Sequence, residues 1–291
     1  MNLNDLLRGK DIDTQHVLLL RHRPWEAQLN KVLPWLAAER PELFNAYQQT
    51  QGEKVEQAMT RARYVAALIG HEPGKALFVG LYSVRGSKRI TRKQFWEIHA
   101  YVQLRKLGMN GFTKEDPRSS ILRFNLALTD FYSDWKGKLI VTWPGLERSW
   151  WRWADRNELP VIAILEESIL DAAMPEWDAI ELTWEQLAVL TNRWKSKLKE
   201  WRGIYYIFDT SDGKGYVGSA CGESNLYGRW INYSARGHGG NRLLRQRDPR
   251  NFRFSILQRV SPDMDVRDVV RLETCWKQRV HTRKPYGLND N

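Results

Sequence analysis

The pattern that most constrains the fold lies near the C-terminus, where two short β-forming runs flank a tight turn. Residues 202–208 are mostly apolar or aromatic, Asp212-Gly-Lys-Gly215 is a turn sequence, and residues 216–219 predict the returning strand. Apolar periodicity then predicts three more elements, a helix over 226–234, a strand over 252–260 and a helix over 266–280. This order favours a small central antiparallel sheet with flanking helices, an α/β domain over 201–291.

The same region carries side chains that suit hydrolysis of a phosphodiester bond. The hairpin brings Tyr205 near Tyr216, and the next helix carries Arg229 and Tyr233 one turn apart. Cleavage needs an activated water, neutralisation of charge on the phosphate and help for the leaving oxygen. The carboxylate of Glu273, in the middle of the last helix, would bind Mg²⁺, and the guanidinium of Arg229 would contact the phosphate.

Two tripeptides, Gly203-Ile204-Tyr205 and Tyr216-Val217-Gly218, resemble the two motifs of the GIY-YIG endonuclease family, with valine for isoleucine in the second. The resemblance covers residues 201–291. Order and spacing of the other family positions agree, and these positions map onto Arg229, Tyr233, Glu273 and Asn289. The resemblance implies a metal-dependent endonuclease that hydrolyses phosphodiester bonds in DNA, while cleavage of RNA stays open.

The resemblance also implies a role for each matched residue. Tyr205 would be the general base, which requires a lowered phenol pKa, and Tyr216 would bind the phosphate or the water. Tyr233 would assist by hydrogen bonding. Glu273 would hold Mg²⁺, which Mn²⁺ can replace at a single carboxylate. The residues that would support this geometry are Gly203, Gly218 and Asn289.

Positive charge is concentrated in the same region. The formal net charge is +11, and residues 201–291 carry 13 Arg, 3 Lys and 9 acidic residues, a net +7. Arginine makes bidentate contacts with phosphate, so this excess predicts a nucleic-acid partner; the alternative is a solvated basic surface. The glycine-rich stretch 235–241 adds His238 and Asn241 as supporting candidates. The arginines expected to track the phosphate backbone are Arg242, Arg245, Arg247, Arg250 and Arg253.

Residues 1–172 predict an α+β domain built on a small, antiparallel, barrel-like sheet. Its strands are expected over 16–24, 121–128, 138–143 and 160–165. Two short helices or one kinked helix are expected over 25–49, a turn at Arg85-Gly86-Ser87, and a helix begun by Thr91. A linker over 173–200, with a helix begun by Thr183, would join this domain to the nuclease domain over 201–291.

Nuclease modules of the family that this chain resembles cut with little selectivity, so the first domain is expected to choose the substrate. The concentration of tryptophan supports this, since nine of the fourteen lie between 135 and 201. Aromatic rings beside arginine suit stacking on an unpaired or flipped base. The candidate base-reading residues are Trp143, Arg148, Trp150, Trp151 and Trp153. In architecture, although not in motif, the domain resembles PUA-like and EVE-type domains that read modified bases. That implies a restriction enzyme directed at modified or foreign DNA in phage defence; the alternative is that these tryptophans fill the core.

Three functions stay open: a targeted DNA endonuclease, a structure-specific DNA repair nuclease, and a nucleic-acid-binding protein whose nuclease fold does not cut. A homodimer is expected if a one-site enzyme cuts both strands. The sequence has no apolar run long enough for a membrane span and no secretion signal, so a cytoplasmic protein is expected. Cys221 and Cys275 do not have the spacing of a metal site or a disulfide framework.

Overall fold

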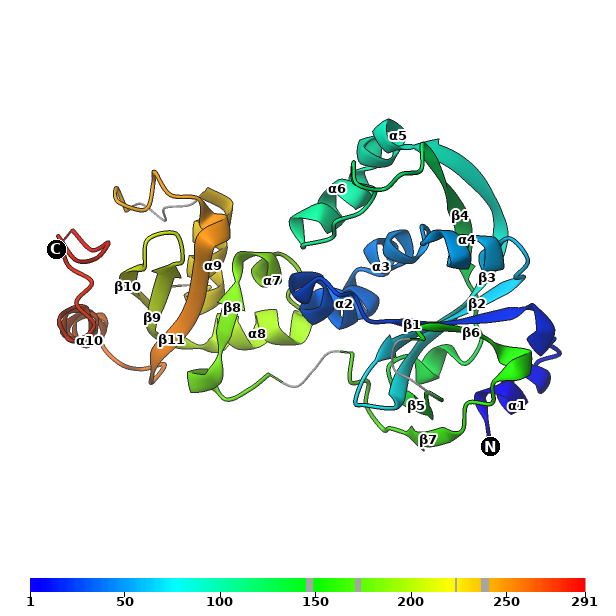
Figure 1. The fold of residues 1–291 in the computed structure, drawn as a ribbon. Helices are drawn as coiled ribbons and strands as arrows, with labels where there is room; N and C mark the ends of the chain where they lie inside the picture. Colours follow the sequence, from blue (N-terminus) through cyan, green and yellow to red (C-terminus); the bar gives the residue numbers. More distant parts are fainter. Residues whose placement is uncertain (145–148, 171–173, 223, 237–240, 291) are drawn as a thin grey trace. The chain divides into compact units, whose positions relative to one another are not determined.

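The computed structural model describes residues 1–144, 149–170, 174–222, 224–236 and 241–290. The chain divides into two compact units, Met1–Asp171 and Ala172–Asn291, and each mixes helices with strands (Figure 1). The predicted α+β class is therefore confirmed. Within these described ranges, no helix is both long enough and apolar enough to cross a membrane.

A curled, mixed sheet of seven strands forms the centre of the first unit. Its order is β6-β1-β2-β3-β5-β7, and β4 pairs with β3 outside this path. The strands are β1 (Val17–His22), β2 (Tyr64–Gly70), β3 (Lys75–Thr91), β4 (Ser120–Leu128), β5 (Leu139–Thr142), β6 (Trp151–Trp153) and β7 (Val161–Ile164). The four strands expected from the sequence, over 16–24, 121–128, 138–143 and 160–165, are thus all present.

The prediction of an antiparallel sheet is wrong for one pair, because β1 and β2 run parallel. Parallel neighbours need a long crossover, which three helices supply here. These are α2 (Ala27–Glu39), α3 (Pro41–Gln48) and α4 (Glu53–Met59). The first two match the predicted pair of short helices over 25–49, and they divide at Arg40 because Pro41 disfavours a helical residue before it.

β3 continues through the turn that the sequence predicts at Arg85-Gly86-Ser87. Its first half pairs with β2 and β5 and its second half with β4, and the register shifts between Val84 and Ser87. Gly86 has a φ of 107°, which a residue with a side chain rarely adopts. Extra residues on one strand form a β-bulge that bends it. The glycine therefore bends β3 and does not reverse it.

Thr91 begins a helix as predicted. Its hydroxyl accepts a hydrogen bond from the Gln94 backbone N–H at 3.3 Å, and the Gln94 side chain accepts one from the Thr91 N–H at 2.9 Å. The helix divides at Ile98 into α5 (Arg92–Glu97) and α6 (His99–Lys106), while α1 (Leu3–Arg8) lies at the start of the chain.

The second unit has a four-stranded antiparallel sheet of order β10-β9-β11-β8, as predicted for its centre (Figure 1). The strands are β8 (Glu181–Thr183), β9 (Arg202–Asp209), β10 (Lys214–Ala220) and β11 (Phe252–Val260). The helices are α7 (Trp184–Ala188), α8 (Asn192–Glu200), α9 (Asn225–Arg236) and α10 (Val266–Arg279). α9 contacts β9, and α10 contacts both β9 and β10.

Residues 173–200, for which the sequence predicts a linker, belong largely to this second unit. β8 pairs with β11, and α8 packs against α9. The helix predicted to begin at Thr183 is present and starts with a capping box of Thr183 and Gln186. It divides after Ala188, and Thr191 caps the second helix through the Trp194 N–H. The segment is folded because β8 pairs with the edge of β11, and the local sequence pattern of residues 173–200 does not predict this pairing.

His22, at the end of β1, is a buried titratable group of the first unit. Its ring is 2% exposed, lies edge-on to Phe44 and Tyr47, and shares a 3.3 Å hydrogen bond with the side chain of Gln48. Burial lowers the pKa of His22 from 6.5 to about 4, although the bond to Gln48 acts in the opposite direction. His22 is therefore neutral in the folded protein at ordinary pH.

This burial predicts a pH-dependent stability of the first unit. The unfolded chain takes up a proton on His22 near pH 6.5, whereas the folded chain does so only near pH 4. Stability that is fully present above pH 6.5 should therefore be lost as the pH falls toward 4, by about 3 kcal/mol for this group. Urea unfolding between pH 7.5 and 4.5 should show a steeper slope in wild type than in His22→Gln. The exposed His99→Gln should keep that slope, and equal slopes in all three proteins would contradict the assignment.

Candidate active site

Three tyrosine hydroxyls form a chain in the second unit. Tyr205 on β9 donates to Tyr233 on α9 at 3.1 Å, and Tyr233 donates to Tyr216 on β10 at 3.3 Å. Tyr205 and Tyr233 are each 1% exposed, whereas Tyr216 is half-buried. The proximity predicted for Tyr205 and Tyr216 is confirmed, with ring centroids 6.4 Å apart. The two strands and the helix thus join three phenols into one chain of hydroxyls that runs from two buried side chains to the half-buried Tyr216.

Both motif glycines are needed for close packing around β9. Gly218 lies opposite Tyr205 in the β9–β10 register, and a Cβ there would overlap the phenol of Tyr205. A Cβ on Gly203 would overlap the backbone carbonyl of Gln258 in β11. These glycines therefore serve close approach, since neither has the positive φ for which glycine is otherwise required.

Glu273 on α10 is held from two sides. One carboxylate oxygen accepts a short hydrogen bond from the Ser219 hydroxyl of β10, and the other lies 2.8 Å from the ammonium of Lys277. The side chains of Glu273 and Lys277 are 17% and 7% exposed. Sequence reasoning missed Ser219 and Lys277, although the Glu273–Lys277 spacing of four is a recognisable helical ion-pair signal.

A hollow of about 400 Å³ joins this carboxylate to the end of the hydroxyl chain, a size within the range of small-ligand sites. The hollow is lined by Tyr216, Asn241, Arg242, Glu273, Lys277, Asn289 and Asp290. Tyr216 is therefore shared by the two halves of the site, because it both accepts from Tyr233 and lines the hollow beside Glu273.

Arg229 lies on α9, one turn before Tyr233, and is exposed. Its positive charge opposes the rise that burial causes in the pKa values of Tyr205 and Tyr216. Among the described residues, none forms an ion pair with Arg229 in this structure. Its guanidinium is thus available to an anion at the edge of the tyrosine chain.

The two strand tyrosines have pKa values opposite to what the general-base role requires. Burial raises the pKa of Tyr205 well above its usual value and also raises that of Tyr216, and the neighbouring Tyr233 phenol adds to both shifts. The charge of Arg229 opposes the shifts without overcoming them. Both phenols are therefore neutral at ordinary pH in the protein without a bound cation, and the general-base role of Tyr205, which requires a lowered pKa near the cation, stays a prediction.

The side chains of Asn289 and Asn241 form hydrogen bonds with backbone groups around the hollow. Asn289 is 1% exposed. Its side-chain NH2 donates to the Val217 carbonyl at 2.8 Å, and its side-chain oxygen accepts from the Val217 N–H at 3.0 Å. Asn289 therefore pairs with the free edge of β10 next to Tyr216. Asn241 accepts from the backbone N–H of Leu243 and of Leu244 at 2.7 and 3.3 Å. Both position the chain around the hollow, and their supporting role in catalysis stays a prediction.

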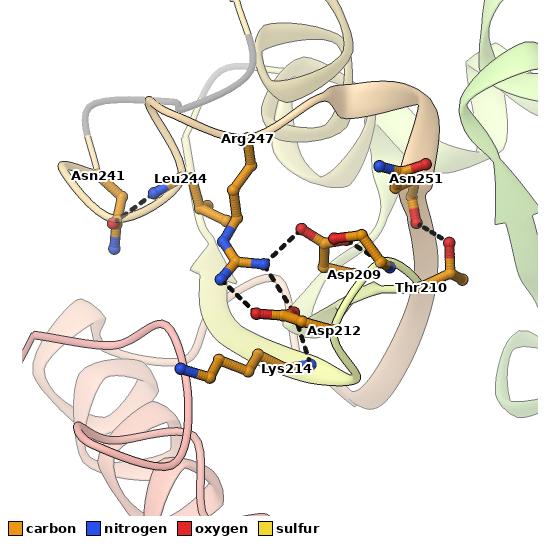
Figure 2. A network of polar contacts seen from close by, with 9 residues as sticks. Asp209, Thr210, Asp212, Lys214, Asn241, Leu244, Arg247 and Asn251 are labelled. Carbon is orange, nitrogen blue, oxygen red and sulfur yellow. Dashed lines mark hydrogen bonds and ion pairs between the residues drawn. The ribbon is translucent and has the colours of Figure 1, made fainter.

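The arginines of the predicted phosphate track have different surroundings. Arg247 is enclosed by acids, as Figure 2 shows: it lies 2.6 Å from Asp209, and 2.8 and 2.7 Å from the two oxygens of Asp212. The Arg247 hydrogen bonds lower the pKa of Asp212 to about 2, and those acids raise the pKa of Arg247. The prediction that Arg247 binds phosphate is therefore corrected, because it neutralises the nearly inaccessible Asp209 carboxylate.

The other four members differ in their freedom to bind. Arg250 pairs with Asp248, and the half-buried Arg253 donates to the backbone carbonyl of Phe252. Arg242 and Arg245 are exposed, and no ion pair of theirs involves a residue that the structure describes. These two are the members of the run best placed to meet a phosphate backbone.

The candidate tryptophans of the first unit separate in a similar way. Trp143 is 2% exposed in the core, with the guanidinium groups of Arg21 and Arg152 5.3 and 5.8 Å from its ring centre. Its predicted base-reading role is corrected, because no face of the ring is open. Trp151 and Trp153 are half-buried on β6, where that strand pairs with β1.

Trp150 lines a pocket of the first unit that sequence reasoning did not find. The pocket has a volume of about 500 Å³, within the range of small-molecule sites. Trp25, which is 83% exposed, lines the pocket together with Tyr47 and Phe112. Arg118 and Asp116 also line it and form a bidentate pair, with N–O distances of 3.0 and 2.7 Å. Only the tertiary fold brings these segments together. Arg148 and His238 lie outside the described residues.

The donor set around Glu273 is relevant to the divalent cation that the resemblance implies. The described part of the chain contains no cluster of three or more His, Cys, Asp and Glu side chains able to hold a metal. The other carboxylate of the hollow, Asp290, pairs with Lys284. Mg²⁺ commonly binds one or two carboxylates and keeps several waters. The residues therefore fit Mg²⁺ at Glu273, in competition with the ammonium of Lys277.

Comparison with known proteins leaves the family undecided. No family model matches the chain, and neither a curated protein nor a solved structure matches it. Membership of the GIY-YIG family stays a prediction.

The Arg247 network gives a stability prediction. Arg247→Ala leaves the Asp209 carboxylate, 1% exposed, without its cation. We expect the free energy of unfolding of the second unit to fall by about 3 kcal/mol, as for other broken buried pairs. The exposed Arg245→Ala should change it by less than about 0.5 kcal/mol. Urea denaturation of both variants tests this, and equal stability of the two would contradict the structural role of Arg247.

Proposed function

We propose that the protein is a metal-dependent endonuclease of GIY-YIG type that hydrolyses phosphodiester bonds in DNA, directed to its substrate by the first unit. The observation that carries the proposal is the hollow where the tyrosine hydroxyl chain ends beside Glu273. It combines a hydroxyl donor, a carboxylate and a nearby guanidinium, three groups that phosphoryl chemistry uses.

Each residue of the site has its own role in the proposed hydrolysis. The exposed guanidinium of Arg229 binds the scissile phosphate and opposes the charge that develops on it. Tyr216, the phenol that lines the hollow, donates a hydrogen bond to a phosphate oxygen or orients the attacking water. Tyr233 and Tyr205 fix the orientation of the Tyr216 hydroxyl through the chain of hydrogen bonds. Mg²⁺ at Glu273 supplies Lewis-acid chemistry when bound, and Mn²⁺ can replace it.

The first unit is proposed to select modified or foreign DNA, which would make the protein a cytoplasmic restriction enzyme in phage defence. The pocket beside Trp25 and Trp150 supports this, because indole rings stack on an extruded base. The Arg118–Asp116 pair on its wall offers polar atoms for the edge of that base. A structure-specific repair nuclease would use the same hollow in the second unit with a different choice of DNA.

A non-cleaving nucleic-acid-binding protein is the second candidate, and two observations favour it. The ammonium of Lys277 already neutralises Glu273, and burial raises the pKa values of Tyr205 and Tyr216. A site in this state binds an anionic backbone through Arg229 without an activated water. The two candidates differ in one measurable property, cleavage.

Cleavage of supercoiled phage and plasmid DNA in Mg²⁺ tests the proposal. Wild type should nick or linearise the DNA, and Glu273→Ala should lower the rate by about 100-fold or more while binding persists, since the lost carboxylate acts in the transition state. Asp268→Ala is a matched control, because Asp268 lies on the same helix but is exposed and paired with Arg271. Equal cutting by wild type and Glu273→Ala would assign the activity elsewhere. Binding without cutting by folded wild type would establish the second candidate.

The substrate pocket is tested by competition between unmodified, methylated, hydroxymethylated and branched duplexes. Trp25→Ala and Trp150→Ala should weaken binding of the preferred duplex by about tenfold, in the range of one lost base–aromatic stack. Trp135→Ala, a half-buried tryptophan outside the pocket, should leave the preference unchanged. A preference for branched DNA that survives in both pocket variants would favour the repair function instead.

A further inference from the structure

Lys277 places a buried positive charge on the carboxylate proposed to bind the metal. It follows Glu273 by four residues on α10, and its ammonium lies 2.8 Å from one carboxylate oxygen. The side chain is 7% exposed, although lysine is almost never so buried unless it is paired. Exposed helical pairs of this spacing contribute little. This one differs because solvent screens it poorly.

The other carboxylate oxygen is also engaged, since it accepts from the Ser219 hydroxyl. A divalent cation on Glu273 would therefore come next to an ammonium that already occupies one oxygen. Two positive charges so close in a partly buried site repel strongly. The ammonium and the cation consequently compete for the same oxygen of Glu273.

The charged groups around the hollow offer the cation little compensation. Asp290 pairs with Lys284, and Arg242 adds a further positive charge. The carboxamide of Asn289 is committed to the backbone of Val217. Among the residues that the structure describes, no carboxylate of the hollow other than Glu273 and Asp290 could share the ion.

We infer that Lys277 is the resident counter-ion of Glu273 and limits the affinity of this site for divalent cations. The inference rests on the proposed cation site, but it concerns binding in the absence of nucleic acid. Lys277 acts through Glu273, and is therefore a positioning residue. Its removal should leave a partly buried carboxylate uncompensated, which a divalent cation then neutralises in its place.

The test is a titration of the full chain with Mn²⁺ and without nucleic acid, in which free Mn²⁺ is followed by electron paramagnetic resonance. Lys277→Met should lower the Kd for Mn²⁺ by about 10-fold or more, as substitutions around metal ligands typically change affinity. The double variant Lys277→Met with Glu273→Gln should lose that gain. Arg271→Met removes the same charge from an exposed position of α10, and should stay within about twofold of wild type because solvent and salt screen it.

The inference is overturned if Lys277→Met binds Mn²⁺ no more tightly than Arg271→Met, or if the double variant keeps the gain. Should Lys277→Met not fold, Lys277→Gln removes the charge while keeping a hydrogen-bond donor, and the same gain is expected of it. Tight Mn²⁺ binding by the variant together with no DNA cleavage by wild type would remove the nuclease function and leave the inference intact. Cleavage by wild type together with an unchanged Mn²⁺ affinity in the variant would overturn the inference and leave the nuclease function intact.

Discussion

The close pairing of β9 with β10 on one side and β11 on the other is the constraint on which the candidate site depends. Gly218 and Gly203 make it sterically possible, since a side chain at either position would overlap Tyr205 or the carbonyl of Gln258. Because Gly218 has no side chain, the phenol of Tyr205 has room beside β10 and reaches Tyr233 on α9. The hydroxyl chain thus depends on the space at Gly218 as well as on the preference of tyrosine for strands.

Buried and partly buried carboxylates determine which basic side chains are committed to structural ion pairs. Asp209 is almost inaccessible and takes Arg247 out of the run of arginines that would otherwise suit phosphate. Glu273 does the same to Lys277, but inside the hollow where chemistry is proposed. Leaving a buried charge unpaired costs more than a surface ion pair returns. The cations free for a ligand, such as Arg229 and Arg245, are those without a buried acid beside them.

Local patterns in the sequence predicted most of the individual elements. The hairpin of β9 and β10, the helix α9, the strand β11 and the helix α10 follow from periodicity and turn residues, and the helix starts at Thr91 and Thr183 were predicted correctly. Errors arose where a distant strand determined the outcome. Arg85-Gly86-Ser87 forms a bulge because β4 continues the pairing of β3, and residues 173–200 fold onto the edge of β11.

The sequence by itself determined which residues could meet: two tyrosines across a hairpin, an arginine and a third tyrosine one turn apart, and a glutamate on the last helix. Only the tertiary structure decided their chemical state, because burial and the identity of the nearest charge depend on segments far apart in the chain. It buried Tyr205, paired Glu273 with Ser219 and Lys277, enclosed Trp143 in the core, and placed Trp25 beside Trp150 at a pocket.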